Sequence, residues 1–304
     1  MKAFITGGSG FIGTFVAHKL LQNNVEVTIF DRREPNAELT HLCNCIQGDL
    51  LDLEKVKNSI GGHDVVYHLA ANADISMGVK DTALDLQLTT IATYNVLESM
   101  RLNTISSIVF LSGSGVYGDA SDTQCVETAG PLLPVSLYGA SKLAAEGLIS
   151  AFSNMFNMKA LIFRPANIVG GGQTHGVLFD FIQKLKRDCH RLEILGDGNQ
   201  TKSYLYIDDL YDAITIALDT QQEAVSVINV ASADTVDVNW IAARVIEFMK
   251  LSEVQITHTK GKVGWVGDVP TVRLNTSKLR QLGWVPQYSS KEAIDKALTE
   301  ILGV

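Results

Sequence analysis

The chain has 304 residues, of which 46% are hydrophobic and 19% are charged, and its formal net charge is −8 at pH 7. This composition is typical of a globular protein large enough for one sizeable α/β domain, or for a domain with a smaller lobe. The acidic balance argues against nucleic acid or an anionic membrane surface as the main partner, because both favour a basic protein face.

Short apolar, β-branched runs alternate with longer amphipathic segments over the first half of the chain. The runs predict strands at 3–6, 26–30, 65–69, 107–111 and 160–163, and the longer segments predict helices at 11–22, 83–101 and 140–156. This rhythm favours an α/β fold of the Rossmann type, with a doubly wound parallel sheet whose strands are buried on both faces.

The alternation loosens after about residue 165. Short strand-like runs at 191–195 and 204–207 are mixed with helices, and 261–270 is rich in glycine and turn-forming residues. We therefore expect a first domain over residues 1–165 and a smaller C-terminal lobe over 166–304. Segments near 204–232 should return to the first domain, because 226–230 again has the pattern of a core strand.

The cellular setting is inferred from the N-terminal sequence and the cysteines. The first residues, MKAFI, enter a strand-like run directly, without the series of regions that makes a signal peptide, and no stretch has the length of a membrane span. The four cysteines form no CxxC pair and no metal-binding pattern with histidine. We expect reduced thiols, no metal and a cytoplasmic enzyme.

A glycine-rich loop, TGGSGFIG, lies at 6–13 between the first strand and the first helix. Gly8, Gly10 and Gly13 fit the pattern GxGxxG, and Gly7, Gly10 and Gly13 fit GxxGxxG. Missing side chains allow the backbone to turn sharply and to approach a pyrophosphate, which then lies on the N–H groups at the positive end of the helix. The loop therefore predicts a dinucleotide cofactor.

Asp31 follows the second predicted strand, at the distance expected for a carboxylate that accepts hydrogen bonds from an adenosine ribose. Its negative charge would repel a 2′-phosphate, which favours NAD over NADP. Arg32 and Arg33 could instead hold such a phosphate, but we interpret them as solvated side chains.

Tyr138 and Lys142 are four residues apart, which puts both side chains on one face of the helix that begins in this segment. A neighbouring ammonium and a bound nicotinamide cation would stabilise the phenolate and lower the pKa of Tyr138 towards neutrality. The pair alone would also suit a surface lysine beside a half-buried tyrosine. Combined with the glycine loop, it predicts that Tyr138 exchanges a proton with a substrate hydroxyl and that Lys142 assists it.

With these motifs in place, the sequence resembles the extended short-chain dehydrogenase/reductases. Within them it is most similar to the NAD-dependent epimerase/dehydratase family, and in particular to the archaeal type of UDP-glucose 4-epimerase. The likeness covers nearly the whole chain and is carried by TGGSGFIG (6–13), Asp31, GDL (48–50), HLAA (68–71), SGVYGD (114–119), SLYGASK (136–142), RPANIVG (164–170), ILGDGNQTKSYLYIDD (194–209) and GDVP (267–270).

The resemblance implies that NAD binds the first domain and that a sugar nucleotide binds the C-terminal lobe. The residues at the family's NAD-binding positions are Gly7, Gly10, Phe11, Ile12, Gly13, Asp31, Asp49, Leu50, Leu69, Ala70, Ala71, Thr89, Tyr138 and Lys142. Thr89 replaces an asparagine that many members carry. Asn167 matches a position that contacts the sugar nucleotide, and Lys202 stands where an arginine usually faces the diphosphate. Trp265 stands where a second phosphate-binding arginine is common.

The loop after the strand 107–111 departs from the family. Its members carry a serine or threonine three residues before the valine of VYG, to help the tyrosine hold the substrate hydroxyl, and here that position is Gly113. Ser112 and Ser114 flank it, but neighbours in an extended segment point to opposite sides. We expect Ser114, in preference to Ser112, to supply the hydroxyl; water is the third possibility.

The same loop also bears on the reaction. Dehydratases of the family carry an Asp-Glu pair just after the catalytic threonine and decarboxylases carry a glutamate, whereas this chain has Ser114 and Gly115. The resemblance therefore implies 4-epimerisation of a UDP-hexose of the UDP-galactose/UDP-glucose type, with NAD recycled in each turnover.

The sequence leaves two alternative functions open, and the resemblance also bears on the oligomeric state. The chain could be a related NAD(P)-dependent sugar-nucleotide dehydratase or reductase, or a non-catalytic NAD-binding sensor. The resemblance implies a homodimer formed through the helices 83–101 and 140–156, although packing on the sheet would also explain their apolar faces.

Overall fold

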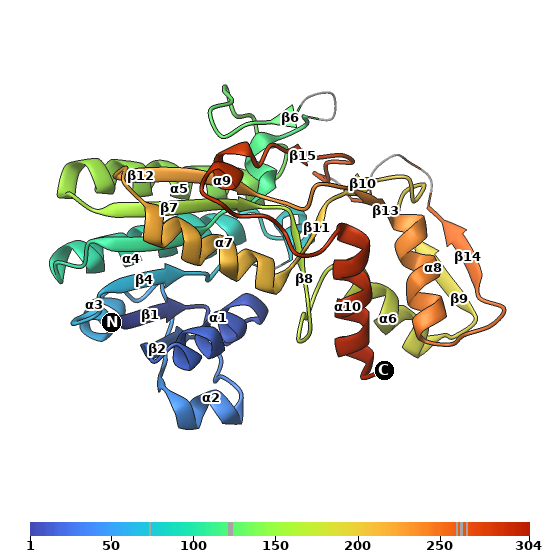
Figure 1. Ribbon diagram of the computed structural model, residues 1–304, viewed down its shortest axis with the longest axis horizontal. Helices are drawn as coiled ribbons and strands as arrows, with labels where there is room; N and C mark the ends of the chain where they lie inside the picture. Colours follow the sequence, from blue (N-terminus) through green and yellow to red (C-terminus); the bar gives the residue numbers. More distant parts are fainter. Residues whose placement is uncertain (73, 121–123, 260, 262–263, 266) are drawn as a thin grey trace. The chain divides into compact units, whose positions relative to one another are not determined.

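The computed structural model describes residues 1–304 except 73, 121–123, 260, 262–263 and 266 (Figure 1). The chain divides into two compact units. The first comprises 1–116, 137–164 and 214–228, and the second comprises 117–136, 165–213 and 229–304. The turn-rich stretch expected at 261–270 lies partly outside the described residues.

Seven strands of the described chain form a sheet with the order β12-β7-β5-β4-β1-β2-β3. The pairs from β3 to β7 are parallel, and registers such as Ile5↔Ile29 and Val109↔Leu161 align the carboxyl ends of neighbouring strands. The strands are β1 (Lys2–Thr6), β2 (Glu26–Asp31), β3 (Asn44–Gln47), β4 (Val65–His68), β5 (Ser107–Leu111), β7 (Lys159–Pro165) and β12 (Val225–Val230).

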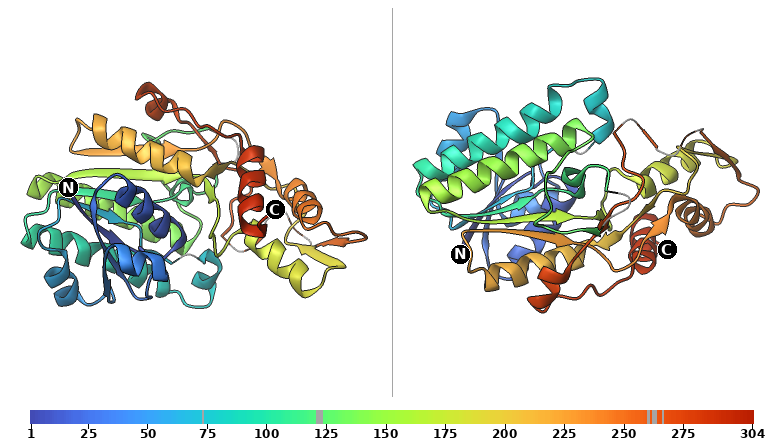
Figure 2. Two further views of the ribbon diagram at one scale, coloured as in Figure 1. Left: turned by 60° about the horizontal axis from the view of Figure 1, so that its bottom comes forward. Right: turned by 90° about the horizontal axis from the view of Figure 1, so that it is seen from above.

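Helices connect these strands. The α-helices of this part are α1 (Phe11–Gln22), α2 (Ala37–Leu42), α3 (Leu53–Ile60), α4 (Ala92–Leu102), α5 (Leu137–Phe156) and α7 (Ile207–Thr220). Short 3₁₀ segments lie at η1 (Ile75–Val79) and η3 (Ser114–Tyr117), and a π-helical segment, η2 (Leu86–Ile91), leads into α4. Figure 2 shows α4 and α5 side by side over one face of the sheet.

Alternation along the strands explains why both faces are covered. Side chains of a strand point to opposite faces in turn. Phe4, Phe110 and Ile162 belong to a fully buried cluster that also contains Val96 of α4 and Ile149 of α5. Their sequence neighbours on the other face are just as buried, as expected for a parallel sheet between helices. The Rossmann-type α/β fold predicted from the sequence is therefore confirmed.

Some elements agree with the sequence pattern to the residue, and others were not predicted. The helix 11–22 and the strand 107–111 have the predicted bounds. The segments α2, β3 and α3 are too short and too polar to show a clear period. The single helix expected at 83–101 is instead the π-helical η2 followed by α4.

The second unit contains short strands and further helices. Its strand pairs are β11 with β8, β14 with β9, β10 with β13 and β15 with β6. Its remaining elements are β6 (Gln124–Cys125), β8 (Asn167–Val169), β9 (Arg191–Ile194), β10 (Thr201–Lys202), β11 (Tyr204–Tyr206), β13 (Val236–Asp237), β14 (Gln255–His258), β15 (Arg273–Leu274), α6 (Val177–Arg187), α8 (Val238–Phe248), α9 (Ser277–Gln281) and α10 (Ser290–Leu302).

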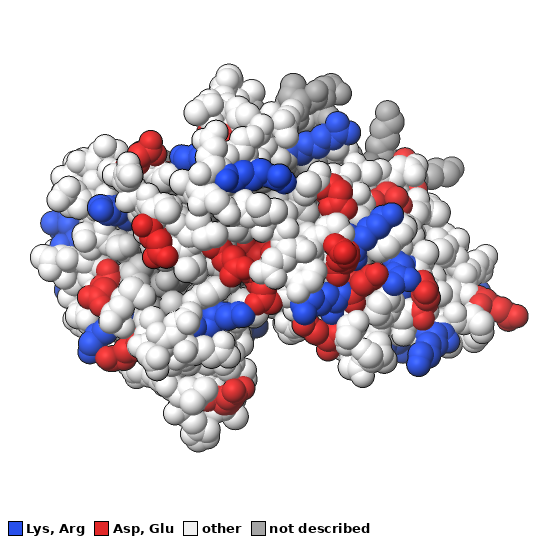
Figure 3. All heavy atoms as spheres, viewed as in Figure 1, with Lys and Arg blue, Asp and Glu red and all other residues white. Residues whose placement is uncertain are grey.

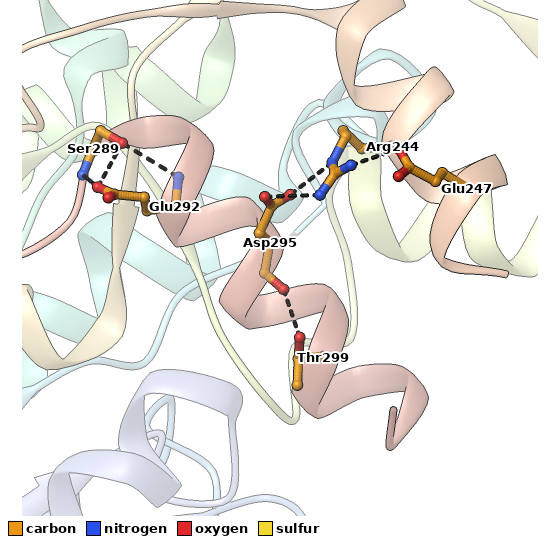
Figure 4. Close-up of polar contacts among 6 residues, drawn as sticks. All are labelled: Arg244, Glu247, Ser289, Glu292, Asp295 and Thr299. Carbon is orange, nitrogen blue, oxygen red and sulfur yellow. Dashed lines mark hydrogen bonds and ion pairs between the residues drawn. The ribbon is translucent and has the colours of Figure 1, made fainter.

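Polar contacts fix the last helix within this unit (Figure 4). Ser289 and Glu292 form a reciprocal capping box at the start of α10. Arg244 of α8 donates from Nε and Nη2 to the two carboxylate oxygens of Asp295, each over 2.9 Å. A bidentate pair of this kind fixes orientation as well as distance, so α8 and α10 hold each other in one register.

The surface charges, the helix lengths and the cysteines each bear on the class of protein. Acidic and basic side chains are interspersed over the face seen in Figure 3. Among the described helices, none is long and apolar enough to cross a membrane. None of the four cysteines, all of which are described, forms a disulfide, and in the described part of the chain no three His, Cys, Asp or Glu residues are grouped as metal ligands.

Candidate active site

The glycine loop connects β1 to α1 in a conformation that excludes side chains. Gly7 has a φ of +73°, and a Cβ atom there would lie 2.7 Å from the backbone of Ala70. A Cβ atom at Gly13 would lie 2.1 Å from the carbonyl oxygen of Gly7. Gly10 is the N-cap residue of α1 and provides no side-chain cap, so the N–H groups of the first helical turn remain available to a ligand.

Asp31 holds this loop from the neighbouring strand. Its Oδ2 accepts a hydrogen bond from the backbone N–H of Ser9 over 3.1 Å, and its Oδ1 accepts one from that of Arg33 over 3.0 Å. The Ser9 hydroxyl donates to the carbonyl of Arg33 over 2.8 Å. The carboxylate is therefore fixed beside the glycine loop, where an adenosine ribose would have to lie.

The other predicted cofactor residues lie at the ends of the adjacent strands. Asp49 and Leu50 follow β3, and the N–H of Gly48 donates to the carbonyl of Asp31 over 2.8 Å. The carbonyl of Leu50 accepts from the Asn95 amide of α4 over 2.8 Å. Leu69, Ala70 and Ala71 follow β4 directly. These residues share the carboxyl edge of the sheet, which is where ligands bind in open α/β sheets.

The buried His68 connects β1 to α4 at this edge of the sheet. Its contacts are Thr6 Oγ1 to His68 Nδ1 at 2.7 Å and His68 Nε2 to Thr93 Oγ1 at 3.0 Å, while Thr93 donates to the carbonyl of Thr89 over 2.6 Å. Because Thr93 uses its proton on that carbonyl, His68 must donate from Nε2 and accept at Nδ1. Burial and the charge of Lys142 lower the pKa of His68 to about 3, so the ring stays neutral.

Tyr138 and Lys142 lie one turn apart on α5. The Lys142 ammonium donates to the carbonyl of Leu111, at the end of β5, over 2.6 Å. It also lies 4.8 Å from the centre of the Phe110 ring and 5.7 Å from that of Tyr138. The lysine is 2% exposed, so the helix brings a buried cation against the tyrosine, as the spacing predicts.

The protein's own groups shift the pKa values of both members of the pair. Burial, and next the charge of Asp85, raise the pKa of Tyr138 to about 12. Burial lowers the pKa of Lys142 to about 7, against the opposing charges of Glu146 and Asp85. The protein's own groups therefore favour the neutral phenol, and a positive charge from a bound cofactor is needed to reverse that preference.

Ser112 is directed away from this pair. Its hydroxyl donates to Oε1 of Glu146 over 2.5 Å. Arg164 donates to the same carboxylate from Nε over 3.0 Å and from Nη2 over 2.6 Å. All three side chains are at most 6% exposed. Ser112 is thus part of a buried ionic network rather than a free hydroxyl.

Unlike Ser112, Gly113 and Ser114 are not part of the buried ionic network. A Cβ atom at Gly113 would lie 3.6 Å from Oη and 3.7 Å from Cε1 of Tyr138, which is ordinary van der Waals distance. Ser114 begins the 3₁₀ segment η3, is half-buried and forms no hydrogen bond through its side chain with the described residues. Of the two serines, only Ser114 therefore has its hydroxyl available.

Thr89 lies in the π-helical segment η2. It is fully buried, and its Oγ1 has no hydrogen-bond partner among the described residues. A buried hydroxyl without a partner is costly. This orphaned oxygen, together with the glycine loop that has no room for side chains, fits a dinucleotide site.

Asn167 and Lys202 belong to the second unit, so they are described apart from Tyr138. Asn167 is exposed and pairs in register with Tyr204. The Lys202 ammonium forms an ion pair of 2.6 Å with Asp268 and lies 5.3 Å from the centre of the Trp265 ring. The lysine therefore already has a carboxylate partner. Tyr117, the conspicuous tyrosine of VYG, is buried and donates to Asn229 over 2.7 Å, which indicates a structural role.

The sequence reasoning missed three charged residues around the catalytic pair, namely Glu146, Arg164 and Asp85. Glu146 has a signal, because it follows Lys142 by four residues on the same helix face. Arg164 and Asp85 have none in their spacing, since a long-range contact brings each of them to α5.

Comparison with known proteins agrees with this geometry. The family model described as the NAD dependent epimerase/dehydratase family matches residues 3–231. A protein from Methanocaldococcus jannaschii, provisionally named a UDP-glucose 4-epimerase, is 30% identical over 97% of this chain and 96% of its own length. A crystal structure titled UDP-galactose 4-epimerase is 33% identical, with a TM-score of 0.89 over 99% of this chain and 98% of that one.

A third similarity concerns a structure with bound cofactor. The UDP-glucose 4-epimerase of Thermus thermophilus, in complex with NAD, is 25% identical, with a TM-score of 0.90 over 100% of both chains. The match to the family model spans well over half of the sequence. The chain therefore belongs to the NAD dependent epimerase/dehydratase family, and its cofactor is NAD.

Proposed function

We propose that this protein catalyses the 4-epimerisation of a UDP-hexose, of the UDP-galactose/UDP-glucose type, with NAD held and recycled. The observation that carries the proposal is the buried Tyr138–Lys142 pair on α5, beside the carboxyl end of β5, with Gly113 facing the phenol. The relatives and solved structures described above support the same reaction class.

Each predicted cofactor residue has a role in this proposal. The backbone of Gly7, Gly10 and Gly13 and the first turn of α1 hold the pyrophosphate, and Asp31 accepts from the adenosine ribose. The remaining residues that line the cofactor are Phe11, Ile12, Asp49, Leu50, Leu69, Ala70, Ala71 and Thr89. When bound, NAD would supply a reversible hydride acceptor for the sugar carbon.

The protein's own residues handle the proton. Tyr138 takes the proton of the sugar hydroxyl and gives it back, so its charge must change within one turnover. Lys142, fixed by Leu111, stabilises the phenolate while it exists. Ser114 orients the hydroxyl, because the Ser112 side chain is committed to Glu146. Asn167 and Lys202 hold the sugar nucleotide from the C-terminal lobe.

The carboxylates of the site favour an epimerase over a dehydratase. A dehydratase needs a second acid/base group to move a proton at a neighbouring carbon. Within the described residues, Glu146 is held by Arg164 and Asp85 is fully buried. Neither is free to reach a substrate, whereas a 4-epimerase requires only the tyrosine.

We also propose a homodimer that forms through η2, α4 and α5. Ile91, Tyr94 and Phe156 are more than 40% exposed although they are large and apolar. Tyr94 and Phe156 both pack on Phe152, at ring-centre distances of 6.2 Å and 5.3 Å. A second copy would cover this apolar strip.

The function is tested by incubating the purified protein with UDP-galactose without added NAD and measuring UDP-glucose. We expect interconversion in both directions, at least a thousandfold slower in Tyr138→Phe because the proton carrier is lost. Tyr94→Phe, which removes a hydroxyl from an exposed tyrosine outside the site, is the control and should remain active.

The proposal fails if no UDP-hexose or UDP-hexuronate is epimerised, or if Tyr138→Phe keeps full activity. Net consumption of NAD(P)H would indicate the reductase alternative, and NAD binding without chemistry the sensor.

A further inference from the structure

Asp85 is a fully buried carboxylate at the start of η2. Its Oδ1 accepts a hydrogen bond from the Asn72 amide over 3.0 Å. Its Oδ2 has no hydrogen-bond partner among the described residues, and a Cβ atom at Gly78 would lie 3.0 Å from this oxygen. The carboxylate is therefore enclosed against the backbone of η1, and among the described residues only one of its two oxygens accepts a hydrogen bond.

A buried, half-paired carboxylate is costly unless a positive charge compensates it. Glu146, the buried carboxylate on α5 itself, accepts two hydrogen bonds from Arg164, and its charge also favours the cationic form of Lys142. Lys142 is a buried cation that, among the described residues, donates only to a neutral carbonyl. A Cβ atom at Gly78 would lie 3.0 Å from Oδ2 of Asp85 and 3.6 Å from Cβ of Leu137, so this carboxylate lies beside the first turn of α5. Asp85 is thus the second buried carboxylate, after Glu146, whose charge favours the cationic form of Lys142, and among the described residues it has no arginine partner of its own.

The other charged or titratable groups around Asp85 do not take over this role. His68 is neutral, and the carboxylate of Asp74 accepts from Ser76 on the exposed side of η1. The side chain of Asp81 accepts from the backbone of Ala83, and on α4 Glu98 pairs with Arg101. The remaining groups on the packed elements are exposed or partly exposed, and they are Lys80 and Tyr94.

We propose that Asp85 is a positioning residue for the proton transfer, and that its buried charge keeps Lys142 as a cation and Tyr138 as a neutral phenol until the cofactor brings a positive charge. The inference rests on the proposed roles of Tyr138 and Lys142. It adds that a carboxylate outside the Tyr-Lys pair sets the charge balance of the pair.

The direction of the effect follows from electrostatics. The charge of Asp85 raises the pKa of both Tyr138 and Lys142. An amide in its place would remove this contribution, so both groups would lose their protons at lower pH. For charges that interact through the protein interior, the expected shift is about one pH unit.

The experiment compares Asp85→Asn with the unaltered protein in two measurements. The first follows the Nζ and Cε chemical shifts of Lys142 against pH in isotope-labelled protein with matched NAD content, the signal being assigned with Lys142→Arg. The second is the pH dependence of kcat for UDP-galactose. We expect the Lys142 midpoint and the acid limb of the kcat profile both to move to lower pH by about one unit.

Two controls separate charge from structure. Asn72→Ala removes the hydrogen bond to Asp85 but keeps the carboxylate, and Asp81→Asn removes an exposed carboxylate before the same helix. Neither should shift the Lys142 midpoint. The inference is overturned if Asn72→Ala reproduces the effect of Asp85→Asn, or if Asp85→Asn shifts the midpoint no more than Asp81→Asn does.

A measurement on the unaltered protein covers the case in which Asp85→Asn folds poorly. The inference requires a charged Asp85, so its ¹³C carboxyl signal must be that of a carboxylate at neutral pH, and a protonated signal would overturn it. The NMR measurements need no turnover. A protein that shows the lysine shift without epimerase activity would therefore refute the proposed function and leave this inference standing.

Discussion

A Cβ atom at Gly113 would lie 3.6 Å from Oη of Tyr138. The backbone of this chain thus directs position 113 at the phenol, but the residue there has no hydroxyl to use. Among the described glycines, Gly115 is the other one whose Cβ would meet this ring, at 3.8 Å from Cδ1 and on the side away from the hydroxyl.

Gly113→Ser should therefore add a hydroxyl within hydrogen-bonding reach of the reacting oxygen. The Cβ meets no atom closer than 3.6 Å, so the protein should fold normally. We expect kcat to rise severalfold, up to roughly tenfold, which corresponds to one hydrogen bond of about 1.4 kcal/mol. Gly115→Ser, whose side chain would face the ring instead, is the matched control and should give no gain. Equal effects of both substitutions would contradict the assigned geometry.

Ser112→Ala and Ser114→Ala should have opposite consequences. Loss of the buried Ser112 hydroxyl leaves Glu146 with one donor fewer, so the free energy of unfolding should fall by about 1.5–3 kcal/mol while kcat stays within about twofold. Ser114→Ala should leave stability unchanged and lower kcat roughly tenfold. Urea unfolding and steady-state kinetics on the two variants measure both quantities. If Ser112→Ala reduces kcat and Ser114→Ala does not, the serine roles are reversed.

The fold could be predicted from the sequence because its signals are local. The glycine loop, the helix 11–22 and the strand 107–111 each carry their own pattern within a few residues. The segments α2, β3 and α3 could not be predicted, since their short, mixed sequences form regular structure through packing on α1, β2 and α4 respectively.

In the candidate site, too, features set by local spacing could be predicted and features set by long-range contacts could not. The position of Tyr138 and Lys142 on one face follows from a spacing of four residues. The fate of Ser112 depends on Glu146 and Arg164, which lie 34 and 52 residues away in the sequence and are brought to it by the sheet. The periodicity of the sequence does not predict such a long-range contact. The raised pKa of Tyr138 could not be predicted either, because it depends on burial and on the charge of Asp85.

Lys142 should make stability depend on pH in the alkaline range. Its pKa is about 7 in the folded protein, against an ordinary value of 10.5. Between these values the unfolded chain binds more protons than the folded protein, so the contribution of Lys142 to stability rises with pH and is lost as pH falls towards 7. We expect the free energy of unfolding, relative to Lys142→Met, to increase from about pH 7 to about pH 9.5 in urea titrations. Lys55→Met, at an exposed lysine, should give a flat difference, and a flat difference for Lys142→Met as well would contradict the lowered pKa of Lys142.

The apolar strip on α4 and α5 should hold two copies together. Tyr94 and Phe156 expose 41% of their area each and flank the ring of Phe152. A carboxylate on such a surface would be desolvated in a dimer but would cost little on a free monomer. Light scattering coupled to size-exclusion chromatography should therefore give twice the chain mass for the unaltered protein and the single chain mass for Tyr94→Asp. Leu42→Asp, at a 54% exposed leucine on α2, should remain dimeric. If Tyr94→Asp elutes like the unaltered protein, the two copies do not meet on this strip.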